Sequence, residues 1–135
     1  MVSLGETLLI RYDENNKEFY YQTLSFISSL RDCYGHAFAY WNHCIFIFGG
    51  YSQKKKQVLN SIWKFDIKKE KSCCWEKCEL KMPFEIYGAV AVVSKSDSSI
   101  HVIGGMNGKS EYQSTHYVMS VVKQYIFLRE KKINK

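Results

Sequence analysis

The chain repeats part of its sequence after about fifty residues. An Asp and a Tyr-Gly pair recur 53 positions further on: Asp13, Tyr34 and Gly35 return as Asp66, Tyr87 and Gly88. Short apolar runs that end in Gly-Gly, at 44–50 and 99–105, are related by an offset of 55. Two residues are therefore inserted between Tyr87 and Gly104, most simply in the turn at 94–99. A period of this length is typical of modular repeat architectures, which limits the folds that the chain can adopt.

The apolar segments have the length and composition of β-strands. They are short, continuous or alternating, and rich in Val, Ile, Phe, Tyr and Trp. Turn-forming residues such as Asn107-Gly108 separate them. Only Thr23–Leu30 could form a helical turn, and its counterpart one period later contains Met82-Pro83, where proline would interrupt a helix. We expect an all-β chain of about nine or ten strands, and its 46% apolar and 16% aromatic residues are those of a folded protein.

The middle copy of the repeat predicts a unit of four strands. Its first strand spans 35–40, and its second spans 45–48 and ends in Gly49-Gly50. A polar loop leads to a third strand at 62–66 and a fourth at about 75–80. Four antiparallel strands in a period of about fifty residues are the plan of a β-propeller blade.

The motif residues of this unit resemble those of the kelch-repeat family. In the middle copy they are Gly49, Gly50, Trp63, Asp66 and Trp75. The next copy keeps Gly104, Gly105 and Tyr117, but it has Ser120 where Asp66 stood and lacks the later Trp. The opening copy supplies only a second half, whose first strand ends at Asp13. The resemblance covers residues 8 to about 120.

The resemblance implies an incomplete kelch-type β-propeller of about two to three blades. We assign residues 1–33 to the second half of a first blade and 34–86 to a complete repeat. Residues 87–128 are expected to form a third, partial repeat, and 129–135 a basic tail. Propellers have about 4–8 blades, so we expect either a fragment or truncated product of a longer propeller, or copies that associate through open blade faces.

Each motif residue has an expected structural role in such a blade. The double glycines allow a bend where a Cβ would clash or where φ is positive. Asp13 and Asp66 should accept backbone N–H bonds at the turn between the third and fourth strands. Trp63 and Trp75 should fill the space between adjoining sheets. For His36, which follows the Tyr-Gly pair, the resemblance implies a structural hydrogen bond.

Cysteine content and the lack of targeting segments favour a cytoplasmic protein, and the basic residues are expected in solvated loops. The net charge of +6 comes mainly from basic runs at Lys54–Lys56, 68–71 and 129–135, each at a predicted turn or at the terminus. These runs lack interleaved aromatic residues, so solvated loops are favoured over a nucleic-acid groove. The first residues lack the pattern of a signal peptide, and no segment has the length and apolar character of a membrane helix. The five irregularly spaced cysteines favour a reducing compartment.

No motif predicts an active site, a metal centre or a cofactor. Cys73, Cys74 and Cys78 lack the paired spacing of a structural zinc site, and we expect buried or exposed thiols. Spacing fixes no carboxylate beside any of the four histidines, His36, His43, His101 and His116. Some kelch propellers are copper or sugar-processing enzymes, but the chain shows no motif that matches them. We therefore expect no catalytic residue.

Protein–protein interaction through loops is the favoured function, because loops on a rigid sheet scaffold present a variable surface. The loops Tyr51–Asn60 and Met106–Ser114 follow the two double glycines and should lie at the same blade edge. The residues expected to contact a protein partner are Tyr51, Lys54, Lys55, Lys56, Met106, Asn107, Lys109 and Tyr112. A kelch-propeller enzyme and a basic-loop nucleic-acid binder are the alternatives.

Overall fold

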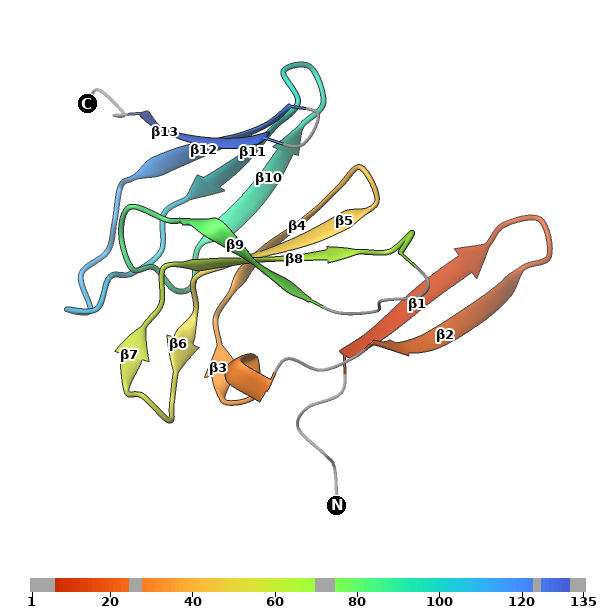
Figure 1. Ribbon diagram of the computed structural model, residues 1–135, viewed down its shortest axis with the longest axis horizontal. Coiled ribbons are helices and arrows are strands. Elements are labelled where there is room, and N and C mark those ends of the chain that lie inside the picture. Colours follow the sequence, from red (N-terminus) through yellow and green to blue (C-terminus); the bar gives the residue numbers. More distant parts are fainter. Residues whose placement is uncertain (1–6, 25–27, 70–74, 123–124, 132–135) are drawn as a thin grey trace.

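The chain folds into antiparallel β-sheets (Figure 1). The computed structural model describes residues 7–24, 28–69, 75–122 and 125–131. The strands are β1 (Thr7–Asp13), β2 (Glu18–Leu24), β3 (Cys33–Tyr34), β4 (Ala37–Trp41), β5 (Cys44–Phe48), β6 (Tyr51–Ser52), β7 (Gln57–Val58), β8 (Ser61–Asp66), β9 (Glu76–Lys81), β10 (Val90–Ser94), β11 (Ser99–Ile103), β12 (His116–Val122) and β13 (Tyr125–Lys131). Ten of these strands have five or more residues, so the predicted all-β fold is confirmed.

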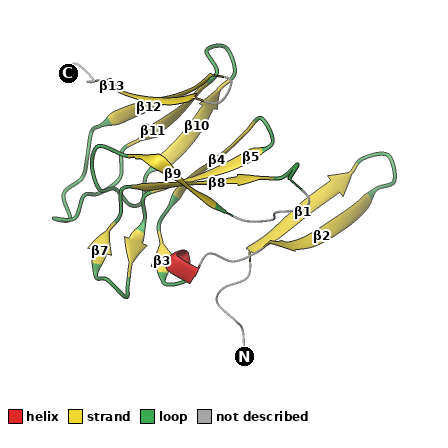
Figure 2. Cartoon of the chain, viewed as in Figure 1, coloured by secondary structure: helices red, strands yellow, loops and turns green. Residues whose placement is uncertain are grey.

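Helical structure in the described residues is confined to one 3₁₀ turn, η1 (Ser28–Leu30), which precedes β3 and is drawn in red in Figure 2. It lies within Thr23–Leu30, the segment that the sequence left open as a helical turn. In this described part of the chain, no helix has both the length and the apolar character that crossing a bilayer requires.

Two four-stranded sheets form the body of the molecule. Strands β4-β5-β8-β9 form one sheet, here called the middle blade, and β10-β11-β12-β13 form the third blade. Strands β1 and β2 pair as a separate two-stranded sheet, the first hairpin, and β3-β6-β7 form a small sheet. Figure 1 shows the third blade beside the middle blade, and the first hairpin on the opposite side of the middle blade.

The third blade has a full set of four strands. Strand β13 pairs with β12 along its whole length, from Val122 opposite Tyr125 to His116 opposite Lys131. The sequence prediction ended this repeat at residue 128 and placed a basic tail at 129–135. Residues 129–131 lie instead in β13. The fourth strand was missed because it lacks the Trp that marks its counterpart in the middle copy and because its end is strongly basic.

The middle and third blades match strand by strand. The offset between β4 and β10 is 53 residues, and that between β5 and β11 is 55. The turn between β4 and β5 is Asn42-His43, whereas the equivalent turn between β10 and β11 spans the four residues 95–98. The two-residue insertion therefore lies in the turn where the repeat analysis placed it.

The main core lies between the middle and third blades. Its buried members on β4, β5, β8, β11 and β12 are Ala37, Ala39, Cys44, Phe46, Phe48, Ile62, Ile100, Val102, Tyr117 and Met119. In β5 the alternation is regular, since Phe46 and Phe48 are buried while Ile45 and Ile47 between them are half-buried. Removal of this apolar surface from water is the main stabilising contribution to the pairing of the two blades.

Each blade buries one face and exposes the other. Val90 and Val92 of the third blade are exposed, although the equivalent Ala37 and Ala39 of the middle blade are buried. Phe38 of the middle blade is 71% exposed, on the face turned away from the third blade. A repeat module that stacks on its neighbours shows this arrangement wherever one neighbour is missing, so the described residues form a partial propeller.

Tyr117, and not Trp63, fills the space between the two blades. Tyr117 is fully buried, and its ring centroid lies 6.1 Å from that of Phe84. Trp63 has the equivalent place on β8, but it shares a face with Ile47 and is only half-buried. Trp75 is also half-buried, with its ring centroid 5.2 Å from that of Phe65. The space between the middle and third blades, which the sequence analysis assigned to the tryptophans, is therefore filled by Tyr117, because Trp63 lies on the opposite face of its sheet.

Candidate functional site

The double glycines direct the chain out of the second strand of each blade. Gly49 and Gly50 have φ angles of 61° and 101°, a region that L side chains rarely adopt. A Cβ on Gly50 would collide with the imidazole of His36, whose Nδ1–H donates to the carbonyl oxygen of Gly49 at 2.8 Å. Gly105, with φ of 92°, is enclosed in the same way, since a Cβ there would lie 2.9 Å from the carbonyl oxygen of Tyr87. The hydrogen bond expected of His36 is present.

The two motif aspartates hold the turns that follow their strands. Asp13 Oδ1 accepts a hydrogen bond from the N–H of Asn15 at 2.9 Å. Asp66 Oδ1 accepts one from the N–H of Lys68 at 3.0 Å. Both bonds have the form expected of an Asp at this turn.

The first loop after a double glycine is the β6–β7 hairpin. Its tip carries the exposed run Lys54–Lys56. The Ser52 hydroxyl accepts a hydrogen bond from the Lys55 N–H at 3.2 Å, and the Gln53 N–H donates to the carbonyl oxygen of Asp32 at 2.9 Å. The hairpin is therefore fixed at its base while its lysines extend into solvent.

The second loop spans 106–114 and is anchored at its start. Met106 exchanges two backbone hydrogen bonds with Tyr87, at 3.0 and 2.9 Å. The Asn107 side chain then organises the turn, because its Oδ1 accepts from the N–H groups of Lys109 at 2.9 Å and Glu111 at 3.0 Å. An Asn that bonds the backbone two residues on is a common device of tight turns.

The two loops meet around one groove of about 550 Å³. Its lining residues are Tyr51, Lys56, Gln57, Val58, Asn60, Pro83, Phe84, Glu85, Asn107, Gly108 and Lys109. The groove thus joins loops of the middle and third blades with the segment 83–85, which connects those blades. We call it the loop groove.

The loop groove is lined by both apolar and charged side chains. Phe84 is half exposed, and the centroid of its ring lies 6.1 Å from that of the buried Tyr117. The Tyr51 ring packs between Tyr34 and Tyr87, at centroid distances of 5.4 and 5.9 Å. The contact of Phe84 with Tyr117 connects the groove to the core, and the Tyr51 contacts connect it to the aromatic rings beside the core.

Four of the eight predicted partner-contact residues line the groove, namely Tyr51, Lys56, Asn107 and Lys109. Lys54 and Lys55 lie beside it at the exposed hairpin tip, and Tyr112 is 86% exposed on the second loop. Met106 is half-buried and serves the anchor at Tyr87. Sequence reasoning missed the segment 83–85 as part of a groove, because it took the Met82-Pro83 pair only as a place where proline would interrupt a helix.

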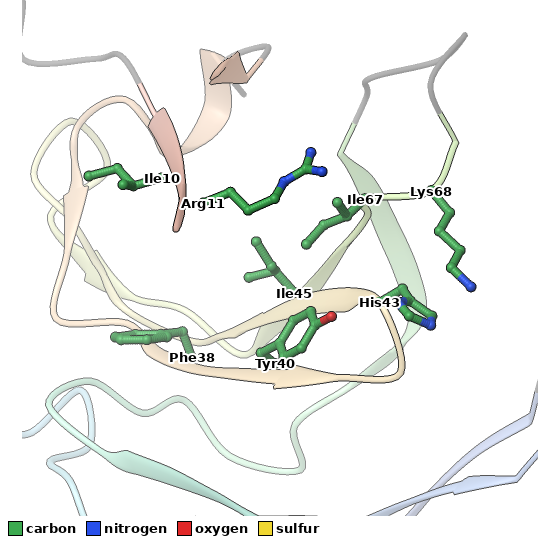
Figure 3. A pocket seen from close by; sticks show the side chains of 8 residues that line it. All are labelled: Ile10, Arg11, Phe38, Tyr40, His43, Ile45, Ile67 and Lys68. Atoms are coloured by element: carbon green, nitrogen blue, oxygen red, sulfur yellow. The ribbon is translucent and has the colours of Figure 1, made fainter. Parts of the chain in front are cut away.

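A larger pocket of about 820 Å³ lies between β1 and the exposed face of the middle blade. Figure 3 shows its eight lining residues: Ile10, Arg11, Phe38, Tyr40, His43, Ile45, Ile67 and Lys68. This is the face whose equivalent in the third blade packs against a neighbouring sheet. We therefore interpret the pocket as space between blades and not as a ligand site.

Two of the described cysteines, Cys44 and Cys78, belong to the core region. Cys44 is buried in the core and Cys78 packs against it, and burial raises the pKa of both thiols above the ordinary value of 9.0. Cys73 and Cys74 lie outside the described residues. Among the residues that are described, no group of three or more His, Cys, Asp or Glu side chains could hold a metal ion.

Two histidines that the sequence treated separately lie together on the third blade. His101 Nδ1 and His116 Nε2 are 2.7 Å apart. A carboxylate is also near, since Asp97 Oδ2 lies 3.9 Å from His101 Nε2 and Ser99 links the two side chains. The expectation that no carboxylate is fixed beside a histidine is wrong here, because the β10–β11 turn brings Asp97 over its own strand.

The four-stranded antiparallel blades, the glycine doublets at equivalent bends and the core between the sheets define a kelch-type β-propeller. The chain belongs to the Attractin/LZTR1 beta-propeller family, whose sequence profile matches residues 3–132. No curated protein sequence matches the chain significantly.

Among solved structures, YjhT, a kelch-type propeller, is similar with a TM-score of 0.68 and 14% sequence identity. The match covers 90% of this chain and 38% of YjhT. The chain thus spans well under half the length of that propeller. At this identity the similarity shows the fold alone.

Proposed function

We propose that this chain is a non-enzymatic scaffold that binds a protein partner through the loop groove. The observation that supports it is the convergence of two loops from neighbouring blades, each placed by its own glycine doublet, on one groove with both apolar and charged lining residues. Loops fixed by a rigid sheet scaffold are common sites of recognition. The odd number of irregularly spaced cysteines supports a cytoplasmic setting for this role.

The charges around the groove indicate the partner's chemistry. Lys56 and Lys109 line it and Lys54 and Lys55 lie beside it, whereas Glu85 is the one carboxylate among its lining residues. Complementary charge favours encounter with an acidic partner segment, and an apolar anchor on that segment would contact Phe84.

Charge reversal in the groove tests the proposal. Proteins captured by the wild-type chain are compared, by quantitative mass spectrometry, with those captured by the double variant Lys56→Glu/Lys109→Glu. Lys95→Glu, in the exposed β10–β11 turn, is the matched control. We expect a partner that the control retains and the double variant loses, with the affinity of the purified pair reduced at least about tenfold, or about 1.4 kcal/mol. Equal binding by all three chains would show that the groove is not the site.

Nucleic-acid binding is the second candidate, because three consecutive lysines are exposed at one hairpin tip. It predicts retention on DNA or RNA that falls steeply with salt and is lost when Lys54, Lys55 and Lys56 are neutralised. An enzyme finds less support, since no His, Cys or Ser is among the residues that line the groove.

A further inference from the structure

Four polar side chains form a continuous line on the exposed face of the third blade. Ser99 Oγ lies 2.6 Å from Asp97 Oδ1 and 2.8 Å from His101 Nε2. His101 Nδ1 in turn lies 2.7 Å from His116 Nε2, on the neighbouring strand β12. Ser99 is buried, and both histidines are half-buried. The line thus runs from the β10–β11 turn across the sheet.

The chemistry of the groups fixes the direction of these hydrogen bonds. Asp97 is an exposed carboxylate, so its oxygens can only accept hydrogen bonds, and Oδ1 lies 2.6 Å from Ser99 Oγ. Ser99 has one hydroxyl proton and donates it to Asp97, so its oxygen must accept from the Nε2–H of His101. A neutral imidazole carries one proton, and the Nδ1 of His101 therefore presents a lone pair toward His116.

From this arrangement we propose that His101 and His116 form a binding site for a divalent transition-metal ion of the zinc, nickel or copper type. The ligands are Nδ1 of His101 and Nε2 of His116, two imidazole nitrogens of the kind these ions prefer. On binding, the metal displaces the Nε2 proton that His116 donates to His101, and His116 takes up one proton from water at Nδ1, so that the lone pair of Nε2 faces the metal. Water completes the coordination.

The distances suit this exchange of a proton for a metal. Tetrahedral ligands about 2.0–2.1 Å from zinc are separated by roughly 3.3 Å, so the two nitrogens would move apart by about 0.6 Å. The rings lie on an exposed sheet face, with centroids 4.9 Å apart, and a small rotation of each provides that movement.

The remaining contacts of His101 are those of a supported metal ligand. Ligating histidines commonly donate their second ring N–H to an oxygen that fixes the tautomer, and Ser99 with Asp97 behind it supplies this support. The equivalent residue in the middle blade is Phe46, which is buried against the third blade. The third blade thus has the hydrogen-bonded imidazole of His101 where the middle blade has the apolar ring of Phe46. This inference is independent of the loop groove.

Zinc titration followed by NMR tests the site. Thiolates are zinc ligands and the chain has five cysteines, so total zinc binding would not isolate the histidine pair. The readout is the imidazole carbon-bound proton resonances, with His36 and His43 as internal controls. We expect the resonances of His101 and His116 to shift together and saturate below about 1 mM zinc, while those of the controls stay in place.

Variants complete the test. His116→Gln should abolish the saturable shift of His101, and Ser99→Ala should weaken binding by about tenfold through loss of the support. His43→Asn, in the exposed β4–β5 turn, should bind as the wild type does. Unchanged far-ultraviolet circular dichroism confirms folding of each variant. No shift of His101 up to 1 mM zinc, or an equal shift in folded His116→Gln, would overturn the site.

Discussion

Gly50 and Gly88 both have positive φ, at 101° and 67°, yet their surroundings differ. A Cβ on Gly50 would enter the ring of His36, whereas a Cβ on Gly88 would meet no atom within 4 Å. Backbone strain therefore acts at both positions, and collision acts at Gly50 alone. The comparison separates the two reasons for which a propeller blade requires glycine.

Alanine substitution at these two glycines should give unequal losses of stability. Gly88→Ala carries only the left-handed backbone strain, about 1–2 kcal/mol. Gly50→Ala adds overpacking against His36 and should lower the free energy of unfolding by about 1–3 kcal/mol more. Urea unfolding of both variants and the wild type measures the difference. Equal losses of unfolding free energy would mean that the His36 ring moves aside without destabilising the fold.

Local patterns in the sequence were sufficient to predict the role of a residue where that role depends on residues close to it in the chain. The glycine doublets, the turn aspartates and the His36 bond are of this kind. The pair of His101 and His116 was not predictable in this way, because it depends on pairing across strands. In the register of β11 and β12, His116 lies opposite Ile103, so the two imidazoles meet diagonally. No motif spacing encodes that geometry.

At the scale of elements, the burial of an aromatic side chain, and therefore its contribution to stability, depends on whether a neighbouring sheet packs on it. Tyr117 on β12 and Trp63 on β8 have equivalent places in successive blades, but only Tyr117 is enclosed by a neighbouring blade. The sequence could indicate that an aromatic is required there. It could not indicate which of the two aromatic side chains would be covered by a neighbouring blade. Strand β13 was missed for a different reason, because it carries no motif residue.

The burial difference predicts a reversed order of sensitivity. Tyr117→Ala removes a fully buried ring from the core and should lower the free energy of unfolding by about 3–5 kcal/mol. Trp63→Ala removes a larger but half-exposed side chain and should cost less than Tyr117→Ala. Thermal and urea unfolding of the two variants measure the order. A greater loss from Trp63→Ala would contradict the assignment of the core.

At the scale of the molecule, each blade has one exposed face. The exposed face of the third blade is equivalent to the face that the middle blade buries, and the exposed face of the middle blade is equivalent to the face that the third blade buries. Val92 occupies the position of the buried Ala39, and Phe38 occupies a position that packs on the core in the third blade. Both faces carry exposed apolar side chains, although the face of the third blade also carries the polar line from Asp97 to His116, and exposed apolar surface favours association when nothing covers it. We therefore expect purified chains to associate through these faces as concentration rises.

A charge on the exposed face of the third blade should suppress this association. Val92→Glu introduces a carboxylate at a position that is 50% exposed, so the folded monomer tolerates it while an apolar contact across the face does not. Ser96→Glu, in the exposed β10–β11 turn, adds the same charge away from the face and serves as the control. Sedimentation velocity over a hundredfold range of concentration should show a rising average mass for the wild type and for Ser96→Glu, and a constant mass for Val92→Glu. A wild-type chain that stays monomeric over the whole range would show that the exposed apolar faces do not drive self-association. In that case the apolar area on each face is too small to offset the entropy lost on association.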